Sequence, residues 1–203
     1  MTATALLAIL QQPHIAIPIC AATVLIIAFA LQRPWTALYV ALMPLINWSF
    51  AAVPTATIPD NLGGGEFQPL AIVTGLVLVA RDFAQREIRN WVLAAMLVGL
   101  ALSTLTSWIT IVLASGAAFL ISETVDWAVY TFVKRPLSQR VMLSSALSAP
   151  LDQVVFIYLA SFVVPGIFAW GTIMTGIASK LLGAAIVAAV LARQERQAEM
   201  KAA

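Results

Sequence analysis

Apolar segments about 20 residues long recur along nearly the whole chain, and only short polar connections separate them. An α-helix of this length crosses the hydrocarbon core of a bilayer. The chain is 62% hydrophobic and 10% charged, whereas a soluble domain carries about 25% charged residues. These features predict an all-α fold, a polytopic integral membrane helix bundle.

The apolar segments define the predicted spans, which are 14–32, 34–54, 68–86, 90–107, 109–133, 141–163 and 168–192. The first is an extra N-terminal transmembrane helix, and the six that follow form a core over residues 34–192. Ala28-Phe29-Ala30 resembles a signal-peptide cleavage site, but no positive charge precedes the apolar stretch, so we expect the segment to be retained. Residues 1–203 are predicted to form one membrane domain, with 193–203 as a cytoplasmic tail.

Basic residues at the ends of the predicted spans and between them occur at alternate connections and in the tail. These residues are Arg33, Arg86, Arg89, Lys134, Arg135, Arg140, Arg193, Arg196 and Lys201. The loop 55–68, the turn near Ser107 and the turn 164–168 contain no Lys or Arg. Because basic connections stay in the cytoplasm, this pattern predicts a multi-pass protein of the cell (inner) membrane with its N-terminus outside and its C-terminus cytoplasmic.

The loop 58–65 ends in three consecutive glycines and is the longest flexible connection. Glycine leaves the backbone loose. The loop is therefore either a simple linker or an external lid over a cavity.

Composition argues against several chemistries. A single cysteine, Cys20, cannot form an intrachain disulfide or a cysteine-ligated metal site, and a single histidine, His14, lies far in sequence from the acids. No glycine-rich phosphate loop with a following lysine is present, so any use of ATP would come from another chain. We expect no metal, no cofactor, no nucleic acid partner and no enzymatic activity.

Six charged residues interrupt the apolar segments or lie near their ends: Arg81, Asp82, Glu123, Asp126, Asp152 and Lys180. Charge in a membrane is costly and persists where it faces a protein interior or an aqueous cavity. We therefore expect a shared polar chamber at mid-depth. The substrate-binding candidates are Asn47, Glu123, Asp126, Trp127, Asp152 and Lys180, and the candidates for gating or coupling are Asp82 and Arg86.

Glu123 and Asp126 are three residues apart and share one helix face. Two carboxylates so close in a low dielectric do not both ionise easily. They either bind substrate or carry a proton, or they lie near the inner interface and are neutralised by Lys134 or Arg135 reaching back.

Asp152 and Lys180 lie near the middle of the last two predicted helices. Asp152 follows Pro150 by two residues, and a mid-helix proline predicts a kink with a freed carbonyl, a device that builds midplane sites in transporters. Lys180 is expected to pair with Asp152 or Glu123. Each of the two residues is either part of a ligand site or only a structural partner.

The remaining candidates have simpler alternatives. Asp82 and Arg86 are spaced as an i,i+4 pair and could form only an interfacial salt bridge. A buried Asn47 both donates and accepts hydrogen bonds. Trp127 could cover the face of a planar ligand.

Short motifs along the chain resemble those of the queuosine precursor transporter family, also called the vitamin-uptake-transporter-like family. They are Asn47-Trp48-Ser49-Phe50, Phe67-Gln68-Pro69, Arg81-Asp82-Phe83-Ala84-Gln85-Arg86, Ser122-Glu123-Thr124-Val125-Asp126 and Ser144-Ser145-Ala146-Leu147-Ser148-Ala149-Pro150-Leu151-Asp152. The resemblance extends from Trp35 to Ala192. It implies a transporter fold and import of a 7-deazaguanine-type precursor.

The resemblance also implies roles for single residues. Asp82 and Arg86 match the acid and the arginine that close the second core helix of the family. Asp126, Asp152 and Lys180 match charged residues of its last three helices. Glu123 falls where the family has glutamine or another polar group, and the helix 14–32 and Arg81 depart from the family pattern.

Three functions are compatible with these observations. The first is a transporter that imports a small planar polar metabolite, most simply a queuosine precursor whose paired N–H donors a carboxylate accepts. The second is a substrate-binding membrane subunit of a vitamin importer driven by a partner ATPase. The third and weaker one is a metal-dependent intramembrane enzyme built on the acids. The predicted partners are the substrate and the lipid bilayer, and the sequence leaves open both a homodimer and a partner ATPase.

Overall fold

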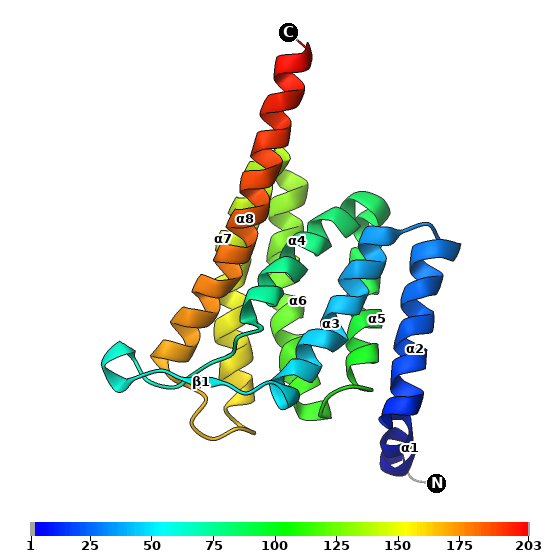
Figure 1. Cartoon of the computed structure of the whole chain (residues 1–203), viewed down its shortest axis with the longest axis vertical. Helices are drawn as coiled ribbons and strands as arrows, with labels where there is room; N and C mark the ends of the chain where they lie inside the picture. Colours follow the sequence, from blue (N-terminus) through cyan, green and yellow to red (C-terminus); the bar gives the residue numbers. More distant parts are fainter. Residues whose placement is uncertain (1–2, 203) are drawn as a thin grey trace. The chain divides into compact units, whose positions relative to one another are not determined.

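The structure is a computed structural model that describes residues 3–202, and nearly all of its regular structure is helical (Figure 1). The elements are α1 (Ala3–Leu10), α2 (Pro13–Leu25), the π-helical turn η1 (Ile26–Ala30), α3 (Pro34–Ala52), β1 (Ala56–Thr57), the 3-10 turn η2 (Asp60–Leu62), β2 (Glu66–Phe67), α4 (Ala71–Ile88), the 3-10 turn η3 (Arg89–Trp91), α5 (Val92–Ser103), α6 (Ile109–Phe132), α7 (Leu137–Ala160) and α8 (Trp170–Ala202).

These elements confirm an all-α membrane helix bundle, and each predicted span contains a helix. Among the described residues, four segments are long and apolar enough to cross a membrane: Pro13–Ala30, Ile109–Val129, Leu137–Ala160 and Trp170–Gln197. α5 has only 12 residues, and α4 carries the charges of Arg81, Asp82, Arg86 and Glu87. The count of six core helices plus one extra helix therefore stays a prediction. The short helix α1 was not predicted.

The chain divides into two compact units. The first comprises Met1–Pro54 and Ala80–Gly116, and the second comprises Thr55–Val79 and Ala117–Ala203. α4 and α6 each contribute to both units. The assignment of residues 1–203 to a single membrane domain stays a prediction.

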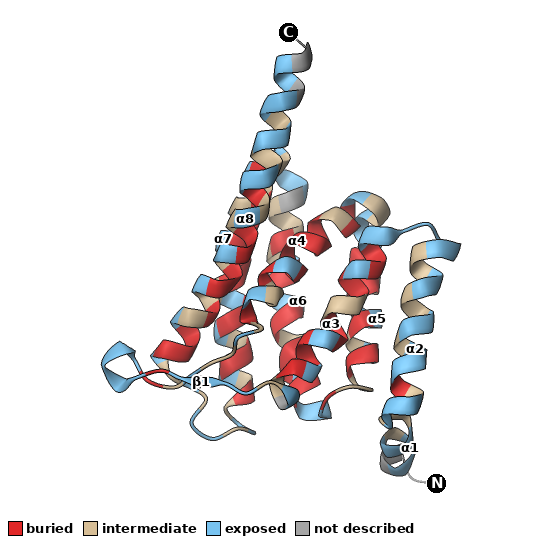
Figure 2. Cartoon of the chain, viewed as in Figure 1, coloured by how far each residue is buried: buried red, intermediate tan, exposed pale blue. Residues whose placement is uncertain are grey.

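In the first unit α3 packs against α5, and α2 lies beside α3 (Figure 1). Gly99 permits a close approach between α3 and α5, since a Cβ atom at Gly99 would lie 2.3 Å from the sulfur of Met43. α2 buries only Ala16 among its described residues (Figure 2). This exposure is what an extra helix on the outside of a core would show.

In the second unit α7 packs against α8, and a short hairpin contacts the start of α8. The hairpin pairs Ala56 with Phe67 and Thr57 with Glu66. The Glu66 N–H donates to Thr172 Oγ1 over 2.9 Å, and the Gly171 N–H donates to the Gly63 carbonyl over 3.2 Å.

The glycine triplet within this loop serves a purpose other than the one the sequence suggested. Gly63, Gly64 and Gly65 all have positive φ values, of 96°, 63° and 92°. A Cβ atom at Gly65 would lie 2.3 Å from Thr172 Oγ1. The triplet thus lets the backbone turn tightly against α8, so the loop is docked on the helix rather than loose.

Each unit also contains a helix whose N-terminus is closed by a glutamate from another helix. In the first unit Glu87 of α4 accepts the backbone N–H groups of Trp35 and Thr36 at the start of α3, over 3.1 and 2.9 Å. In the second unit Glu195 of α8 accepts the N–H and the hydroxyl of Ser138, over 3.2 and 2.6 Å.

The two capped helix starts have similar sequences, Arg33-Pro34-Trp35-Thr36 and Arg135-Pro136-Leu137-Ser138. A proline at the start of a helix needs no hydrogen-bond partner for its nitrogen, and a carboxylate satisfies the N–H groups that follow it. Each cap therefore places the end of one helix beside the basic start of another.

The sequence predicts a kink at Pro150. α7 runs from Leu137 to Ala160 with Pro150 inside it, so the chain is helical on both sides of the proline and the kink itself stays a prediction. A proline is tolerated within a membrane helix where neighbouring groups satisfy the carbonyl that it frees. Asp152 thus projects from a continuous helix.

Candidate functional site

Three helices of the second unit meet at Asp152. Its Oδ2 atom forms an ion pair with the Nζ atom of Lys180 on α8. Its Oδ1 atom accepts a hydrogen bond from the hydroxyl of Ser122 on α6, over 3.3 Å. Ser122, Asp152 and Lys180 are all buried, with at most 5% of each residue exposed. The structure therefore brings together two of the predicted binding residues, and we name these three residues the Asp152 cluster.

Lys180, and with it the Asp152 cluster, lies well inside Trp170–Gln197, a segment long and apolar enough to cross a membrane. Lys180 follows the first residue of α8, Trp170, by ten residues. At a rise of about 1.5 Å per residue this places Lys180 about 15 Å along the helix, half the thickness of a hydrocarbon core of about 30 Å. A charged pair at this depth marks a functional site by default.

Two glycines fix the position of Lys180. A Cβ atom at Gly75 of α4 would lie 2.5 Å from the backbone carbonyl oxygen of Lys180, and one at Gly183 would lie 3.1 Å from the carbonyl oxygen of Ile72. The backbones of α4 and α8 therefore touch at this crossing. Small residues allow such close contact between membrane helices.

Gln153 is a buried polar residue that the sequence analysis did not identify. Its Nε2 atom donates to the carbonyl of Thr172 on α8 over 3.3 Å. A Cβ atom at Gly176 would lie 2.2 Å from this same Nε2 atom, so the glycine makes room for the amide. The one feature of the sequence that could have indicated Gln153 is its position directly after Asp152 within an apolar segment.

Two serines extend the polar face of α7 from Asp152 towards its N-terminus. Ser148 and Ser145 precede Asp152 by four and seven residues, a spacing that places all three on one helix face. Both serines are at most 1% exposed, and within the described chain neither Oγ atom has a hydrogen-bond partner. A buried hydroxyl without a partner is a group that water or a ligand can satisfy.

Glu123 and Asp126 are also fully buried, one and four residues after Ser122 on α6. α6 and α7 are consecutive and run in opposite directions. Because Ser122 is level with Asp152, Asp126 lies one helical turn away, at the level of Ser148. Lys134 and Arg135, which the sequence suggested as neutralising partners, are both exposed.

Trp127 has a different environment from the two acids. It is half-buried, and its ring meets Phe132 edge-to-face, with ring centroids 6.2 Å apart and an interplanar angle of 79°. Phe132 is 73% exposed. The role of Trp127 in covering a ligand stays a prediction.

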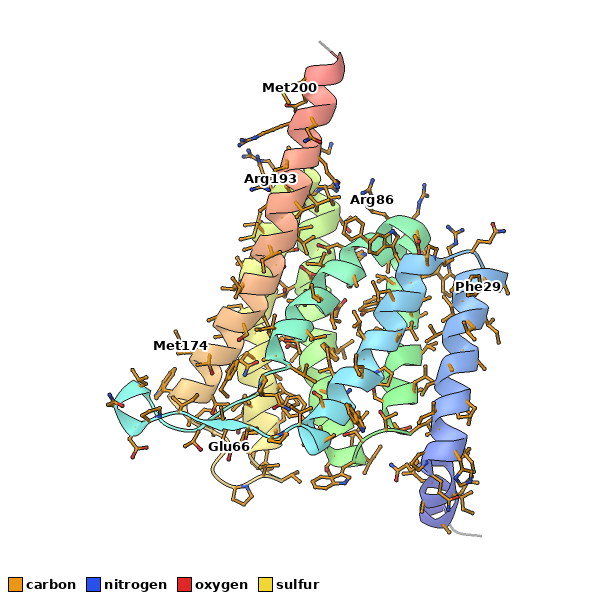
Figure 3. All side chains as sticks on the ribbon, in the orientation of Figure 1. Phe29, Glu66, Arg86, Met174, Arg193 and Met200 are labelled. Carbon is orange, nitrogen blue, oxygen red and sulfur yellow. The ribbon has the colours of Figure 1, made fainter. Side chains whose placement is uncertain are left out.

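The other predicted site residues belong to the first unit. Asn47 is fully buried, and its Oδ1 and Nδ2 atoms have no hydrogen-bond partner among residues 3–202. Asp82 forms an ion pair with Arg81 over 3.0 Å, while Arg86 is exposed at the end of α4 (Figure 3). The roles of Asn47, Asp82 and Arg86, and their grouping with the Asp152 cluster, stay predictions.

The polar groups of the Asp152 cluster are suited to forming hydrogen bonds and ion pairs with a ligand. It contains a carboxylate, an ammonium group and a hydroxyl, with an amide at Gln153 next to it. Within the described part of the chain, no group of three or more His, Cys, Asp or Glu residues is placed to hold a metal ion.

Comparison with known proteins identifies a family. A family model described as "Putative vitamin uptake transporter" matches residues 66–193, well over half of the chain. The matched segment contains the whole Asp152 cluster together with Asp82, Arg86, Glu123 and Asp126. No curated protein and no solved structure matches the chain.

Proposed function

Because the chain belongs to the vitamin uptake transporter family, we propose that it imports a queuosine precursor of the 7-deazaguanine type. Membership of the family makes the chain a membrane transporter for vitamin-like substrates. The identity of the substrate is our proposal, which rests on the short motifs described above and on the chemistry of the Asp152 cluster.

The observation that carries the proposal is the buried carboxylate of Asp152, held by Lys180 and Ser122. A guanine-type base presents an N–H group and an amino group side by side, and a carboxylate accepts both at once. Binding would replace the ammonium of Lys180 at Oδ2 by a donor of the base. The hydroxyl of Ser148 would then be available to the remaining polar edge.

We further propose that Glu123 and Asp126 receive the ammonium of Lys180 when it leaves Asp152, or carry the coupled proton. Both acids are buried on the helix that supplies Ser122. A buried charge that loses its oppositely charged partner in a low dielectric needs a second such partner close by. In this proposal Asn47 and Trp127 contact the base, and Asp82 and Arg86 act in gating or coupling.

The test is uptake of a labelled 7-deazaguanine precursor by a host that lacks its own route. Asp152→Asn and Glu123→Gln keep the size of each side chain but remove its charge. We expect both variants to lose most of the uptake per molecule of protein in the membrane, so the amount of each variant in the membrane is measured alongside uptake. Asp60→Asn, which changes an exposed acid in the loop, is the matched control. Uptake that survives unchanged in Asp152→Asn would contradict the proposed site.

A second experiment distinguishes a transporter that works alone from the binding subunit of a larger importer. The chain has no phosphate-binding loop of its own. We expect the purified protein in liposomes to accumulate the labelled precursor when an ion gradient is applied. Binding without transport, restored by a partner ATPase, would instead assign the protein to the second class.

A further inference from the structure

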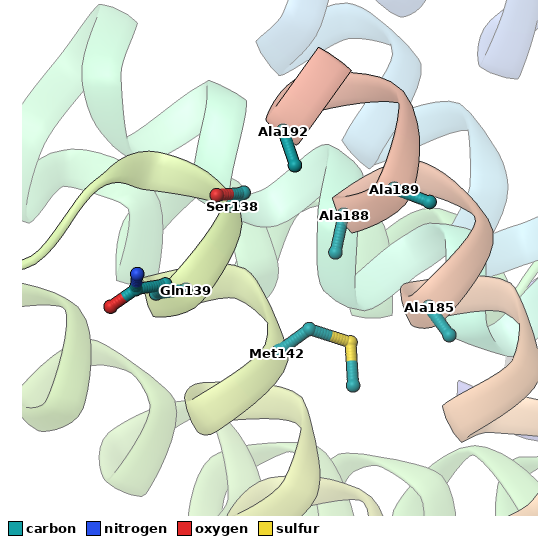
Figure 4. Close-up of a pocket in the computed structure, with 7 residues that line it drawn as sticks. All are labelled: Ser138, Gln139, Met142, Ala185, Ala188, Ala189 and Ala192. Atoms are coloured by element: carbon teal, nitrogen blue, oxygen red, sulfur yellow. The ribbon is translucent and has the colours of Figure 1, made fainter. Parts of the chain in front are cut away.

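A groove lies between α7 and α8 of the second unit, away from the Asp152 cluster (Figure 4). It has a volume of about 310 Å³. Its lining comes from Ser138, Gln139 and Met142 of α7 and from Ala185, Ala188, Ala189 and Ala192 of α8. The groove is open along one side, and its floor is apolar because the alanines offer only methyl groups.

The groove extends along the second half of the span formed by α8. Ala185 and Ala192 lie 15 and 22 residues after Trp170. At a rise of about 1.5 Å per residue these positions are about 22 and 33 Å along α8, so the groove begins in the half of a core of about 30 Å beyond Lys180 and ends just past its edge. The basic ends of both helices lie at this side.

Positive charge continues the line of the groove beyond its apolar floor. Arg193 follows Ala189 by four residues and Arg196 follows Ala192 by four, so both arginines lie on the helix face that lines the groove. Both are exposed, and Figure 3 labels Arg193 on α8. The nearby acid, Glu195, accepts two hydrogen bonds from Ser138.

We propose that this groove binds one acyl chain of an anionic phospholipid whose phosphate lies on Arg193 and Arg196. The groove has room for roughly ten groups of the size of water, at about 30 Å³ each, which suits a stretch of hydrocarbon chain. Basic pockets between membrane helices at the cytoplasmic side suit anionic headgroups. The combination of an apolar slot and two adjacent arginines fits a lipid better than it fits an uncharged helix.

The experiment measures lipid retained by the purified full-length protein. The protein is stripped of lipid in detergent and mixed with phosphatidylglycerol or with phosphatidylcholine of identical acyl chains. Bound lipid is then counted by native mass spectrometry. We expect phosphatidylglycerol to be retained preferentially. Arg193→Gln and Arg196→Gln should each weaken it roughly fivefold, the factor that corresponds to about 1 kcal/mol per basic residue near an anionic surface.

Filling the groove tests the acyl chain separately. Ala189→Leu and Ala192→Leu place larger side chains at partly exposed positions of the groove, and they should reduce the retention of phosphatidylglycerol. Ala178→Leu changes an exposed alanine of α8 outside the groove, and Arg33→Gln changes an exposed arginine of the first unit. Both control variants should retain lipid as the unchanged protein does.

Two outcomes would overturn the proposal. Equal retention of the two lipids, unaffected by the groove and arginine variants, would show that no specific lipid site exists. A change of oligomeric state in Ala189→Leu or Ala192→Leu with unaltered lipid retention would assign the groove to contact between copies of the chain. Circular dichroism and a monodisperse elution profile identify variants that fold, and only these are compared.

Discussion

Asp152 connects three helices through the two oxygens of one carboxylate. Lys180 and Ser122 each bind a different oxygen, so both sides of the group are satisfied. A buried ion pair contributes little net stability because desolvation offsets the attraction between the charges, whereas removal of one partner is costly. The pair is thus better understood as a device for specificity or transport than as a source of stability.

This argument leads to a prediction for single and double substitutions. Asp152→Asn or Lys180→Met alone leaves one buried charge without its partner and should cost about 3–5 kcal/mol of unfolding free energy. The double variant should recover much of that loss, because the remaining amide still accepts from Ser122. Denaturant unfolding of the purified proteins in detergent measures the three values.

Transport provides the control for this comparison. If the pair binds substrate, the double variant should be stable and yet inactive in uptake. If the pair serves only packing, uptake should return together with stability. A double variant destabilised by the full sum of the two single variants would contradict the direct coupling of Asp152 and Lys180.

At the scale of single residues, the sequence predicted the buried charged groups and the pairing of Lys180 with an acid, but not the uncharged residues around them. The cost of placing Asp152 and Lys180 in an apolar segment is visible in the chain, and their pairing was anticipated. The contact with Ser122 and the position of Gln153 were not, because contacts between helices depend on rotation about each helix axis.

Among the elements, α4 and α8 cross with their backbones in close contact beside the cluster. The backbones meet at Gly75 and Gly183, and this contact holds the backbone of Lys180. Neither backbone can move aside as the end of a flexible side chain can. The two glycines therefore position the backbone of Lys180, while the ion pair with Asp152 positions its ammonium group.

We predict that Gly75→Ala will be destabilising. The added methyl group would lie 2.5 Å from the carbonyl oxygen of Lys180 and should separate the helices, at a cost of about 1–3 kcal/mol. Gly116→Ala is the matched control, because its methyl group would meet Leu100 at an ordinary 3.4 Å, and alanine favours a helix. Thermal unfolding of both variants compares them, and equal stability would argue against the tight crossing.

The sequence predicted the elements by their apolar length and missed what fixes their ends. Glu87 and Glu195 each cap a helix start more than fifty residues away in the sequence, so no local pattern predicts these contacts. Pro150 predicts a kink because an interior proline removes a backbone hydrogen bond. α7 continues on both sides of Pro150, as a membrane helix can where neighbouring groups satisfy the freed carbonyl.

The whole molecule has one strong regularity, the alternation of connections that contain Lys or Arg with connections that contain neither. In the second unit the hairpin contacts the start of α8, whereas the basic start of α7 is tied to Glu195 near the other end of α8. The two kinds of connection therefore lie at opposite ends of one long helix. This arrangement is what the positive-inside rule requires of a multi-pass protein.

The orientation itself is a prediction that can be tested by cysteine labelling. In a Cys20→Ala background, Asn61→Cys places a thiol in the exposed loop and Gln194→Cys places one at an exposed position of α8. A membrane-impermeant maleimide applied to intact cells should label only Asn61→Cys. After the cells are opened, Gln194→Cys should react as well.

The opposite labelling pattern would place the C-terminus outside and would contradict the positive-inside reading. Equal labelling of both cysteines in intact cells would show that the reagent crosses the membrane, whereas the Cys20→Ala protein, which has no thiol, controls for reaction at groups other than cysteine. The result bears on the direction of transport, because it establishes from which side the Asp152 cluster would be loaded.

The sequence by itself determined the class of protein, the approximate spans and the residues whose burial needs a reason. The physical cause is that lipid offers no water to a polar group, so length, apolarity and misplaced charge are readable in a single chain. The tertiary structure decided which of these charges meet, at Asp152 and Lys180, and which hydroxyl joins them. Such contacts depend on helix rotation and close crossings at glycine, which distant parts of the chain establish only when they pack together.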